Sequence, residues 1–479
     1  MSARIGVQAL TRFGATAVSD SCAREGGSPP VELAAAAVDS RRITPGALFA
    51  ALPGRYSDGH DYLEDAVARG ASVLLVDAER TESNAGTLDR LREQVRVLAV
   101  SDVLSALQGL AAEHLDCNTS AVRIGITGSN GKTSTKEILF SILSQIGHTF
   151  RSEGNLNSEI GVALAALSVE PSHRYAVFEM AMDHAGEMEQ LARIVRPSHA
   201  IVTNTADAHT EFVGGRERVA REKRMIYSQT GAGGFVYIPA DDAFAPILGD
   251  RAFLSALGAT PVYVGRDATE GFEGYRSRGL AGGDLFFRGR SIAVRLPGQF
   301  VADNALCAIA VAETLGAGTE AIVRGLETVQ PLFGRGEVHT GRVTVLSDCY
   351  NANPQSMQGA LATVASSDIG GRLVLILGDM KELADSRAQH ERLGRDIAHL
   401  EPQPAVVIFV GPETACSVAA ARGEGCRAET IHVADAQAAE EAVRRLVRDG
   451  DTVLLKGSRS LELERLLPAL GVEGGKHVS

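Results

Sequence analysis

The sequence predicts an α/β protein of three domains, the second built around a parallel sheet and the third doubly wound. Three observations predict this fold. The chain has 479 residues, which suffices for about three domains of ordinary size. An apolar strand at 122–126 runs into a glycine-rich turn and then a helix. After residue 335, apolar strands alternate with helices, as they do in doubly wound sheets.

The composition is that of a globular protein rather than a nucleic-acid-binding one. Hydrophobic residues make up 45% and charged residues 22% of the chain, which allows a large core under a solvated surface. The formal net charge of -12, without a long basic run, argues against nucleic acid as the main partner. A small anionic substrate remains compatible, because one local basic site would bind it.

Two absences favour the cytoplasm. The six cysteines are scattered, with no CxxC or CxxH pair, which argues against zinc and suits a reducing compartment. The N-terminus lacks a basic-then-apolar signal segment, and no apolar run approaches membrane-spanning length. We therefore expect a cytoplasmic protein without a membrane partner.

The strand, turn and helix that start at residue 122 have the arrangement of a phosphate-binding loop. Gly128 and Gly131 would let backbone N–H groups approach phosphate oxygens at the positive end of the helix. Lys132 would reach the β- and γ-phosphates, and the Thr133 hydroxyl would bind Mg²⁺. Ile126 stands where the full P-loop pattern has a glycine, and a turn that binds nothing is the alternative. Because Gly-Lys-Thr falls at the junction of strand and helix, we favour a central P-loop ATPase domain.

Residues 1–118 form the predicted first domain. A helix is expected at 62–69 and a buried strand at 71–76. Ser40 and Arg41 precede a turn, where they could contact an anion or a pyrimidine. Alone, this pair is more typical of a turn with a surface arginine.

Residues 119–334 form the predicted central domain, where polar side chains lie at the ends of two apolar strands. The strand at 175–179 ends in Glu179, which is placed to hold Mg²⁺ or to be an ordinary carboxylate at a strand end. His209 follows the strand at 200–204, at the edge where open parallel sheets bind ligands. Spacing alone supports a solvated loop histidine equally well.

Three further segments complete the central domain. A charged helix at 216–227 contains Lys223, which the pattern places on a solvated face. Two short strands around a glycine turn are expected at 284–294. Asn304 lies at the start of an alanine-rich helix, either as a contact to an adenine edge or as a helix cap.

Residues 335–479 form the predicted third domain. Its expected strands lie at 343–346, 373–377, 405–410, 430–433 and 452–455. Polar turns at 348–354, 378–383 and 456–459 follow three of these strands, so we expect the turns on one edge of the sheet. No GxGxxG fingerprint opens the domain, which rejects a dinucleotide-binding fold.

Taken together, these motifs resemble the Mur ligases, the ATP-dependent amide ligases of peptidoglycan synthesis, over nearly the whole chain. The resemblance rests on Asp39-Ser40-Arg41, Asp58-Gly59-His60, Thr127 to Thr133, Gly154-Asn155-Leu156-Asn157, Glu179, Ala208-His209, Tyr350-Asn351-Ala352-Asn353-Pro354 and Gly378-Asp379-Met380. The last two motifs are the most specific, and they point to the family member that adds a dipeptide. The Asp-Asn-Pro-Arg motif of the member that adds diaminopimelate or lysine is absent.

The resemblance implies a role for each domain. The first would bind a UDP-sugar, the central one ATP with two Mg²⁺, and the last would close over ATP and admit the incoming amine. The implied substrates are UDP-N-acetylmuramoyl-tripeptide and D-alanyl-D-alanine, joined through an acyl phosphate with release of ADP and phosphate. We expect a cytoplasmic monomer that serves cell wall synthesis, and hence cell shape and division.

The resemblance also implies roles for individual residues. ATP contacts would come from Gly128, Ser129, Asn130, Gly131, Lys132, Thr133, Ser134, Asn304, Arg335, Asp348 and Asn351. Catalysis would rest on Lys132, Glu179, His209, Lys223 and Arg335. The implied metal ligands are Thr133, Glu179, His209 and Lys223, the last as a carbamylated lysine, and the implied substrate contacts are Ser40, Arg41, Asn155 and Asn157. Departures from the family pattern fall at Asp183, Met225, Phe300, Val301 and Ser347, whereas the phosphate and metal residues are intact.

Three other activities are compatible with a nucleotide site. Another ligase of the family would take a different amino acid or a folate-type acceptor, which Asn351-Ala352-Asn353-Pro354 argues against. A non-catalytic module would use ATP only to switch conformation, which the intact metal residues argue against. A kinase would release a stable phosphorylated product without a second substrate.

Overall fold

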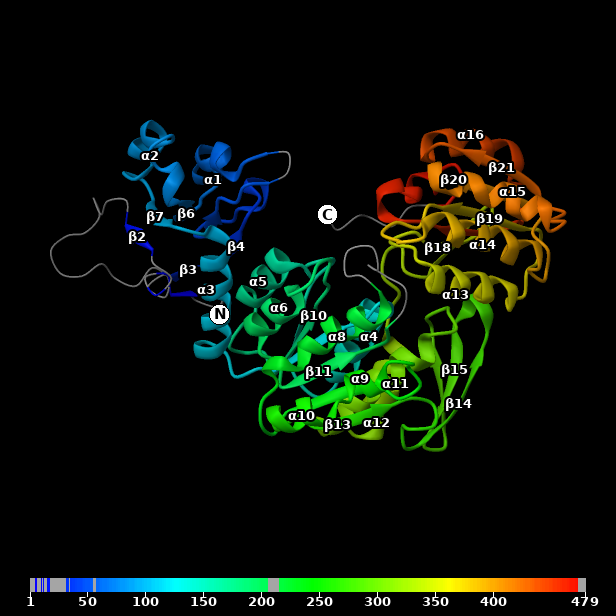
Figure 1. Ribbon diagram of the computed structural model, residues 1–479, viewed down its shortest axis with the longest axis horizontal. Helices are drawn as coiled ribbons and strands as arrows, with labels where there is room; N and C mark the ends of the chain where they lie inside the picture. Colours follow the sequence, from blue (N-terminus) through cyan, green and yellow to red (C-terminus); the bar gives the residue numbers. More distant parts are fainter. Residues whose placement is uncertain are drawn as a thin grey trace.

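The computed structural model describes residues 35–54, 57–205 and 215–472, and, nearer the N-terminus, residues 5–6, 10, 12, 15–17 and 32–33. Figure 1 shows three lobes, with the N-terminal and C-terminal lobes standing on opposite sides of a central one. Each lobe contains its own main β-sheet with helices packed on it. The predicted α/β fold with three domains is therefore confirmed.

The first domain has a mostly parallel sheet. Its five described strands run in the order β2-β7-β6-β5-β4, and only β2 is antiparallel to its neighbour. The described strands are β1 (Ile5–Gly6), β2 (Thr16–Ala17), β3 (Glu32–Leu33), β4 (Ala36–Ala37), β5 (Leu48–Ala50), β6 (Val73–Asp77) and β7 (Arg96–Val100). The helices are α1 (Leu63–Ala68), α2 (Ala85–Leu91), α3 (Val103–Cys117) and the 3-10 turns η2 (Ser40–Arg42), η3 (Gly59–Tyr62) and η4 (Ala78–Arg80).

The second domain is built on a parallel sheet. Its six described strands run in the order β13-β12-β11-β8-β10-β9. They are β8 (Val122–Thr127), β9 (Thr149–Arg151), β10 (Tyr175–Glu179), β11 (His199–Val202), β12 (Phe235–Pro239) and β13 (Thr260–Val264). The helices are α4 (Lys132–Leu143), α5 (Glu159–Leu167), α6 (Glu187–Val195), α8 (Arg216–Arg224), α9 (Ala245–Leu248), α10 (Arg251–Leu257), α11 (Val301–Thr314), α12 (Thr319–Thr328), and the 3-10 turns η5 (Met225–Gln229) and η6 (Gly279–Ala281).

A three-stranded antiparallel sheet extends this domain toward the third. It consists of β14 (Phe272–Ser277), β15 (Gly283–Phe287) and β16 (Arg290–Val294). The two strands expected at 284–294 are confirmed. The third strand, β14, was not expected, because its glycine and its partly exposed polar residues give no clear alternation.

The third domain is doubly wound, as predicted. Between residues 335 and 472 six strands run in the order β17-β18-β22-β19-β20-β21, and all but β17 are parallel. The strands are β17 (Glu337–Thr340), β18 (Thr344–Asp348), β19 (Leu373–Gly378), β20 (Val406–Val410), β21 (Glu429–Val433) and β22 (Thr452–Lys456). The helices are α13 (Pro354–Ala365), α14 (Ser386–Ala398), α15 (Ala415–Gly423), α16 (Ala436–Leu446), and the 3-10 turns η7 (Pro412–Thr414), η8 (Arg459–Leu461) and η9 (Leu463–Leu466).

The domains are joined unequally. One continuous hydrophobic core links Leu107 and Leu110 of α3 with Val162 and Ala166 of α5, so the first and second domains share buried side chains. The two core clusters of the third domain contain only its own residues, with Leu280 of η6 packed against one of them. We infer that the third domain is the one attached most loosely. No helix within the described residues is long and apolar enough to cross a membrane.

Candidate active site

The loop between β8 and α4 is shaped by two glycines with positive φ. Gly128 has φ 153°, and a Cβ there would lie 1.8 Å from Thr203 Oγ1. Gly131 has φ 79° and forms the N-cap of α4 without a side-chain cap. A Cβ at Gly131 would lie 2.2 Å from Asn304 Oδ1. The loop therefore presents backbone N–H groups at the start of α4, the arrangement that binds phosphate.

Two side chains of α4 turn toward this loop and the neighbouring strand. The Lys132 ammonium donates to the carbonyl oxygen of Gly128 at 2.7 Å. The Thr133 hydroxyl donates to Glu179 Oε2 at 2.8 Å, across the pairing of β8 with β10. Burial lowers the pKa of Lys132, and the nearby Glu179 carboxylate opposes that shift.

Glu179 is 1% exposed and surrounded by donors and cations. Asn157 Nδ2 donates to its Oε1 at 2.9 Å, and Lys136 Nζ lies 3.6 Å from its Oε2. Burial alone would raise the pKa of Glu179, but Arg335, Lys136 and Lys132 outweigh it and the pKa stays below the ordinary value. The side chain is therefore an anion held next to a hydroxyl.

The residues present fit a hard divalent cation with oxygen ligands. The Thr133 hydroxyl and the Glu179 carboxylate are donors of the kind that Mg²⁺ takes alongside water and phosphate oxygens. Among the described residues, no three His, Cys, Asp or Glu side chains gather closely enough to hold a metal by themselves. His209 lies in 206–214, outside the described residues.

Lys223 is buried rather than solvated, so the interpretation from the charge pattern was wrong. It is 1% exposed on α8, on the face that also buries Val219 four residues earlier. Burial, with the neighbouring charge of Lys132, lowers the pKa of Lys223 well below its ordinary value, against the opposing effect of Asp183 and Glu222. The helix is charged around most of its circumference, which hid this face from sequence analysis.

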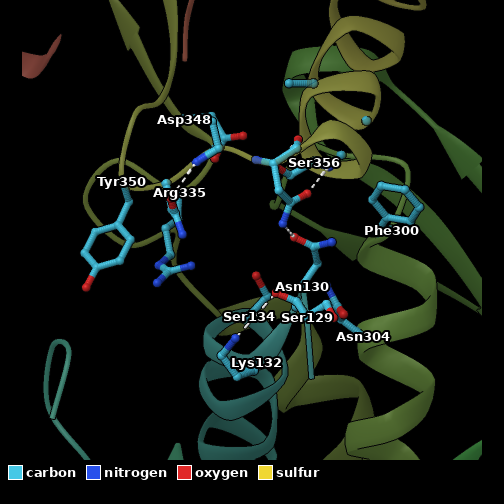
Figure 2. Close-up of a pocket in the computed structure, with 18 of the residues that line it drawn as sticks. Ser129, Asn130, Lys132, Ser134, Phe300, Asn304, Arg335, Asp348, Tyr350 and Ser356 are labelled. Carbon is cyan, nitrogen blue, oxygen red and sulfur yellow. Dashed lines mark hydrogen bonds between the residues drawn. The ribbon is translucent and has the colours of Figure 1, made fainter. Parts of the chain in front are cut away.

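The third domain contributes the opposite wall of the site. The Arg335 guanidinium stacks 4.0 Å from the centre of the Tyr350 ring. Lys456 donates to Asp348 Oδ2 at 2.6 Å and to the carbonyl oxygen of Asn351 at 3.1 Å. Figure 2 shows Arg335 and Asp348 facing Lys132 and Ser134 across an open space. The expected alignment of the three polar turns on one sheet edge is confirmed, because Lys456 contacts the turn after β18 and Ser458 bonds to Asp379 and Lys381 in the turn after β19.

A cavity of about 360 Å³ separates the two domains at this point. That volume suits a nucleotide-sized ligand. Most of the predicted ATP-site residues line it, namely Ser129, Asn130, Gly131, Lys132, Ser134, Asn304, Arg335, Asp348 and Asn351, together with Asn157 and Glu179. Gly128 and Thr133 do not line the cavity, but each is hydrogen-bonded to a residue that does, Gly128 to Lys132 and Thr133 to Glu179.

Asn304 is not a helix cap. The N-cap of α11 is Phe300, and Asn304 is buried in the first turn of the helix beside Gly131. Its amide therefore faces the cavity, which rejects the alternative interpretation of this residue as a cap.

The predicted substrate contacts are divided between two places. Ser40 is buried in η2 of the first domain, and the exposed Arg41 pairs there with Asp39 at 2.6 Å. Asn155 lies on an exposed loop, whereas Asn157 reaches Glu179 in the cavity. None of Ser40, Arg41 and Asn155 lines the cavity.

Sequence reasoning missed Lys136 as part of the site. Lys136 is completely buried one helical turn after Lys132, and it donates to the carbonyl oxygen of Ser152 at 2.8 Å. Its i,i+4 spacing from Lys132 is the signal that could have identified it, because both residues then lie on the same side of α4.

Fold and site together define a P-loop nucleotide-binding enzyme whose third domain faces the nucleotide cavity. The chain matches the catalytic domain of the Mur ligase family over residues 34–115, the Mur ligase middle domain over 126–312 and the Mur ligase glutamate ligase domain over 334–459. The chain belongs to the Mur ligase family, and it is an ATP-dependent ligase.

Individual relatives resemble the chain over almost its full length. It is 38% identical to the UDP-N-acetylmuramoyl-tripeptide–D-alanyl-D-alanine ligase of Treponema pallidum, covering 91% of this chain and 93% of that one. The enzyme of that name from Escherichia coli is 34% identical, with 93% and 95% covered. A crystal structure of MurF from Acinetobacter baumannii aligns with a TM-score of 0.82 at 29% identity over 98% of both chains. The MurF ligase of Thermotoga maritima in complex with ADP aligns with a TM-score of 0.72 at 25% identity, covering 91% and 97%.

Proposed function

We propose that this chain joins D-alanyl-D-alanine to the terminal carboxylate of UDP-N-acetylmuramoyl-tripeptide, with cleavage of ATP to ADP and phosphate. The single observation that carries the proposal is the cavity lined by the phosphate loop and Glu179 of the central domain and by Arg335 and Asp348 of the third. The substrates are those named for the UDP-N-acetylmuramoyl-tripeptide–D-alanyl-D-alanine ligases that resemble this chain over nine-tenths of its length. The reaction would be a step of peptidoglycan precursor synthesis in the cytoplasm, by a monomer.

The first chemical step would form an acyl phosphate. An oxygen of the tripeptide carboxylate bonds to the γ-phosphorus of ATP, and the bond to the leaving ADP breaks. The N-terminus of α4 and the Lys132 ammonium stabilise the negative charge on the phosphate oxygens. The Arg335 guanidinium, from the third domain, is a second positive group in the cavity. Mg²⁺ bound by Thr133 and Glu179 would neutralise further phosphate charge.

The second step would form the amide. The dipeptide's amine nitrogen bonds to the acyl carbon, and phosphate leaves with the electron pair of the broken C–O bond. The amine must lose a proton as the bond forms. Exclusion of water by the two facing domains protects the acyl phosphate from hydrolysis.

Lys223 supports the proposal as a carbamylated residue. Carbon dioxide adds only to a neutral amine, and burial, which lowers the pKa of Lys223, favours that form. The carbamate would place a carboxylate near the Lys132 ammonium group, which would attract it. His209 is proposed as a further metal ligand on the family resemblance alone.

The remaining proposed contacts between the protein and its substrates rest on the positions of the residues in the three domains and on the family resemblance. We propose that Asn304 contacts the adenine, because its amide lies in the cavity wall beside Gly131. Ser40 and Arg41 would contact the UDP moiety from the first domain, with Asn155 and Asn157 nearer the peptide. The proposed domains are 1–118, 119–334 and 335–479, bound respectively to the UDP-sugar, to ATP, and to the dipeptide.

ADP release tests the proposal. Wild-type protein should form ADP from ATP in the presence of UDP-N-acetylmuramoyl-tripeptide far faster with D-alanyl-D-alanine than without it. Lys132→Ala should lower that rate by about 10²- to 10³-fold, whereas Arg221→Ala, on the exposed side of α8, should leave it unchanged. Turnover with a single amino acid but not the dipeptide would assign a sister activity. The proposal would be overturned if the rate of ADP release did not depend on either UDP-N-acetylmuramoyl-tripeptide or D-alanyl-D-alanine.

A further inference from the structure

The side chain of Asn130, in the phosphate loop, makes two hydrogen bonds to the third domain. Its Nδ2 donates to Gln355 Oε1 at 2.7 Å, and its Oδ1 accepts from Asn353 Nδ2 at 2.7 Å. Figure 2 shows the Asn130 side chain pointing away from Lys132 and toward the start of α13. We call Asn130, Asn353 and Gln355 the amide cluster.

The backbone of Asn130 is held by the central domain instead. Its N–H donates to Asn204 Oδ1 at 3.0 Å. Its carbonyl oxygen accepts from Thr203 Oγ1 at 2.6 Å and from Asn204 Nδ2 at 3.0 Å. Asn130 is thus fixed through its main chain to the end of β11 and through its side chain to α13.

The partner residues are fixed within the third domain. Asn353 is the N-cap of α13, and its Oδ1 accepts from the N–H of Ser356 at 2.9 Å while Ser356 completes a capping box. Gln355 follows in the first turn of the same helix. Because both residues are part of α13, a movement of the third domain would carry them away from the phosphate loop together.

Other contacts across this boundary also fall on or next to α13. A Cβ at Gly359 would lie 2.6 Å from the Phe300 ring, and a Cβ at Gly279 would lie 2.5 Å from Ser367 Oγ. Gln355 and Gly359 are four residues apart on α13, which places them on one side of the helix, and Ser367 follows just beyond its C-cap. The two hydrogen bonds of the amide cluster lie in the same interface as these contacts and contribute to its stability.

We propose that Asn130 is a positioning residue whose side chain couples closure of the third domain to the geometry of the phosphate loop. The proposal deepens the proposed function and rests on it. With the amide cluster formed, the loop and α13 are held together, and water is kept from the acyl phosphate. With the cluster broken, the third domain opens more often and the acyl phosphate is hydrolysed before the amine attacks.

Variants of Gln355 test the cluster without altering the phosphate loop. Gln355→Leu removes the amide oxygen that accepts from Asn130 Nδ2. Gln355→Glu replaces that oxygen by a carboxylate oxygen, which can accept the same hydrogen bond. Gln358→Leu is the matched control, because Gln358 lies on the same helix but donates to Asp396 within the third domain. In the presence of the tripeptide nucleotide and ATP without dipeptide, we expect Gln355→Leu to release ADP about fivefold faster than wild type, the factor for one lost hydrogen bond. Gln355→Glu and Gln358→Leu should match wild type.

A second prediction distinguishes loss of the contact between Asn130 and Gln355 from general destabilisation of the protein. In an Asn130→Ala background, Gln355→Leu should add no further hydrolysis, because the contact it removes is already absent. ADP formed per amide formed should be one for wild type and above one for each cluster variant. Equal hydrolysis by Gln355→Leu and Gln358→Leu, or full additivity with Asn130→Ala, would overturn the coupling role.

X-ray scattering distinguishes a wrong coupling role from a wrong function. With the non-hydrolysable analogue AMPPNP, wild type and Gln355→Glu should have a smaller radius of gyration than Gln355→Leu. If Gln355→Leu scatters like Gln358→Leu, the amide cluster does not hold the domains together, whatever the ligation assay gives. Failure of wild type to ligate, with scattering as expected, would overturn the function and keep the cluster.

Discussion

At position 128, the phosphate loop has space for a glycine alone. A methyl group would overlap the Thr203 hydroxyl, and φ 153° is a conformation that L side chains rarely adopt. We expect Gly128→Ala to weaken AMPPNP binding at least about tenfold in calorimetry, because the backbone N–H groups must shift to relieve the overlap. Gly154→Ala is the control, since Gly154 also has positive φ but a Cβ there meets nothing within 4 Å. Equal affinity in both variants would show that the loop adapts.

His199, on β11, is expected to make the stability of the central domain sensitive to acid. Burial lowers the pKa of His199 to about 4, from 6.5. Its Nδ1 lies 2.9 Å from the Tyr237 hydroxyl, and its ring stacks on Phe235. The unfolded chain takes up a proton near pH 6.5, whereas the folded chain does so only near pH 4. The stability contributed by the neutral ring is therefore complete above pH 6.5 and is lost as the pH falls to about 4.

The shift corresponds to about 3 kcal/mol across that window. We expect His199→Gln to flatten the fall in the calorimetric unfolding midpoint between pH 7 and pH 4.5. In the control variant His399→Gln, which changes an exposed histidine, the unfolding midpoint should fall with pH as steeply as in wild type. A His199→Gln curve parallel to wild type would show that other groups carry the acid sensitivity.

Single residues also show where sequence reasoning stopped. The phosphate loop was predicted from spacing, because glycines, lysine and threonine act there through their immediate neighbours in the chain. The charge pattern placed Lys223 on the wrong face and left Asn304 with two possible roles, because their positions depend on the buried face of α8 and on the approach of Gly131. Such contacts come from the tertiary structure and leave no local pattern.

Among the elements, α13 carries the boundary between the second and third domains. Gly359 on this helix leaves room for the Phe300 ring at the start of α11. We expect Gly359→Leu to push α13 away from the central domain and to lower the ligation rate at least about tenfold, since Arg335 and Asp348 would move with it. Ala362→Leu, at a partly exposed position on the same helix, is the control. Unchanged steady-state rates in Gly359→Leu would show that the contact is dispensable.

Strands were predicted with unequal success, for a physical reason. Three parallel strands of the third domain, β19, β20 and β22, are buried along their whole length and read as apolar runs, and all five expected strands were found. The antiparallel edge strands β14 and β17 were not expected, because they are partly exposed and mix polar with apolar residues. Their pairing depends on partners that lie elsewhere in the sequence.

In the whole molecule, the cavity exists only because distant segments meet. The phosphate loop and the start of α13 are 225 residues apart at Asn130 and Gln355, and the hydrogen bond between them could not be inferred from either segment alone. The sequence did indicate that strand ends of both domains carry the site. What it could not indicate is that the first domain shares a core with the second, while the third meets the second through contacts that include those on and next to α13.

One isotope measurement tests the central claim, that a carboxylate of the peptide attacks the γ-phosphate of ATP in this cavity. UDP-N-acetylmuramoyl-tripeptide with ¹⁸O in its terminal carboxylate would be incubated with ATP, D-alanyl-D-alanine and the wild-type protein. An acyl phosphate requires that one ¹⁸O leaves with the phosphate and the other remains in the new amide. Labelled phosphate, in equal amount to amide, is the result we predict. Unlabelled phosphate would mean that water cleaves ATP, and would contradict the account.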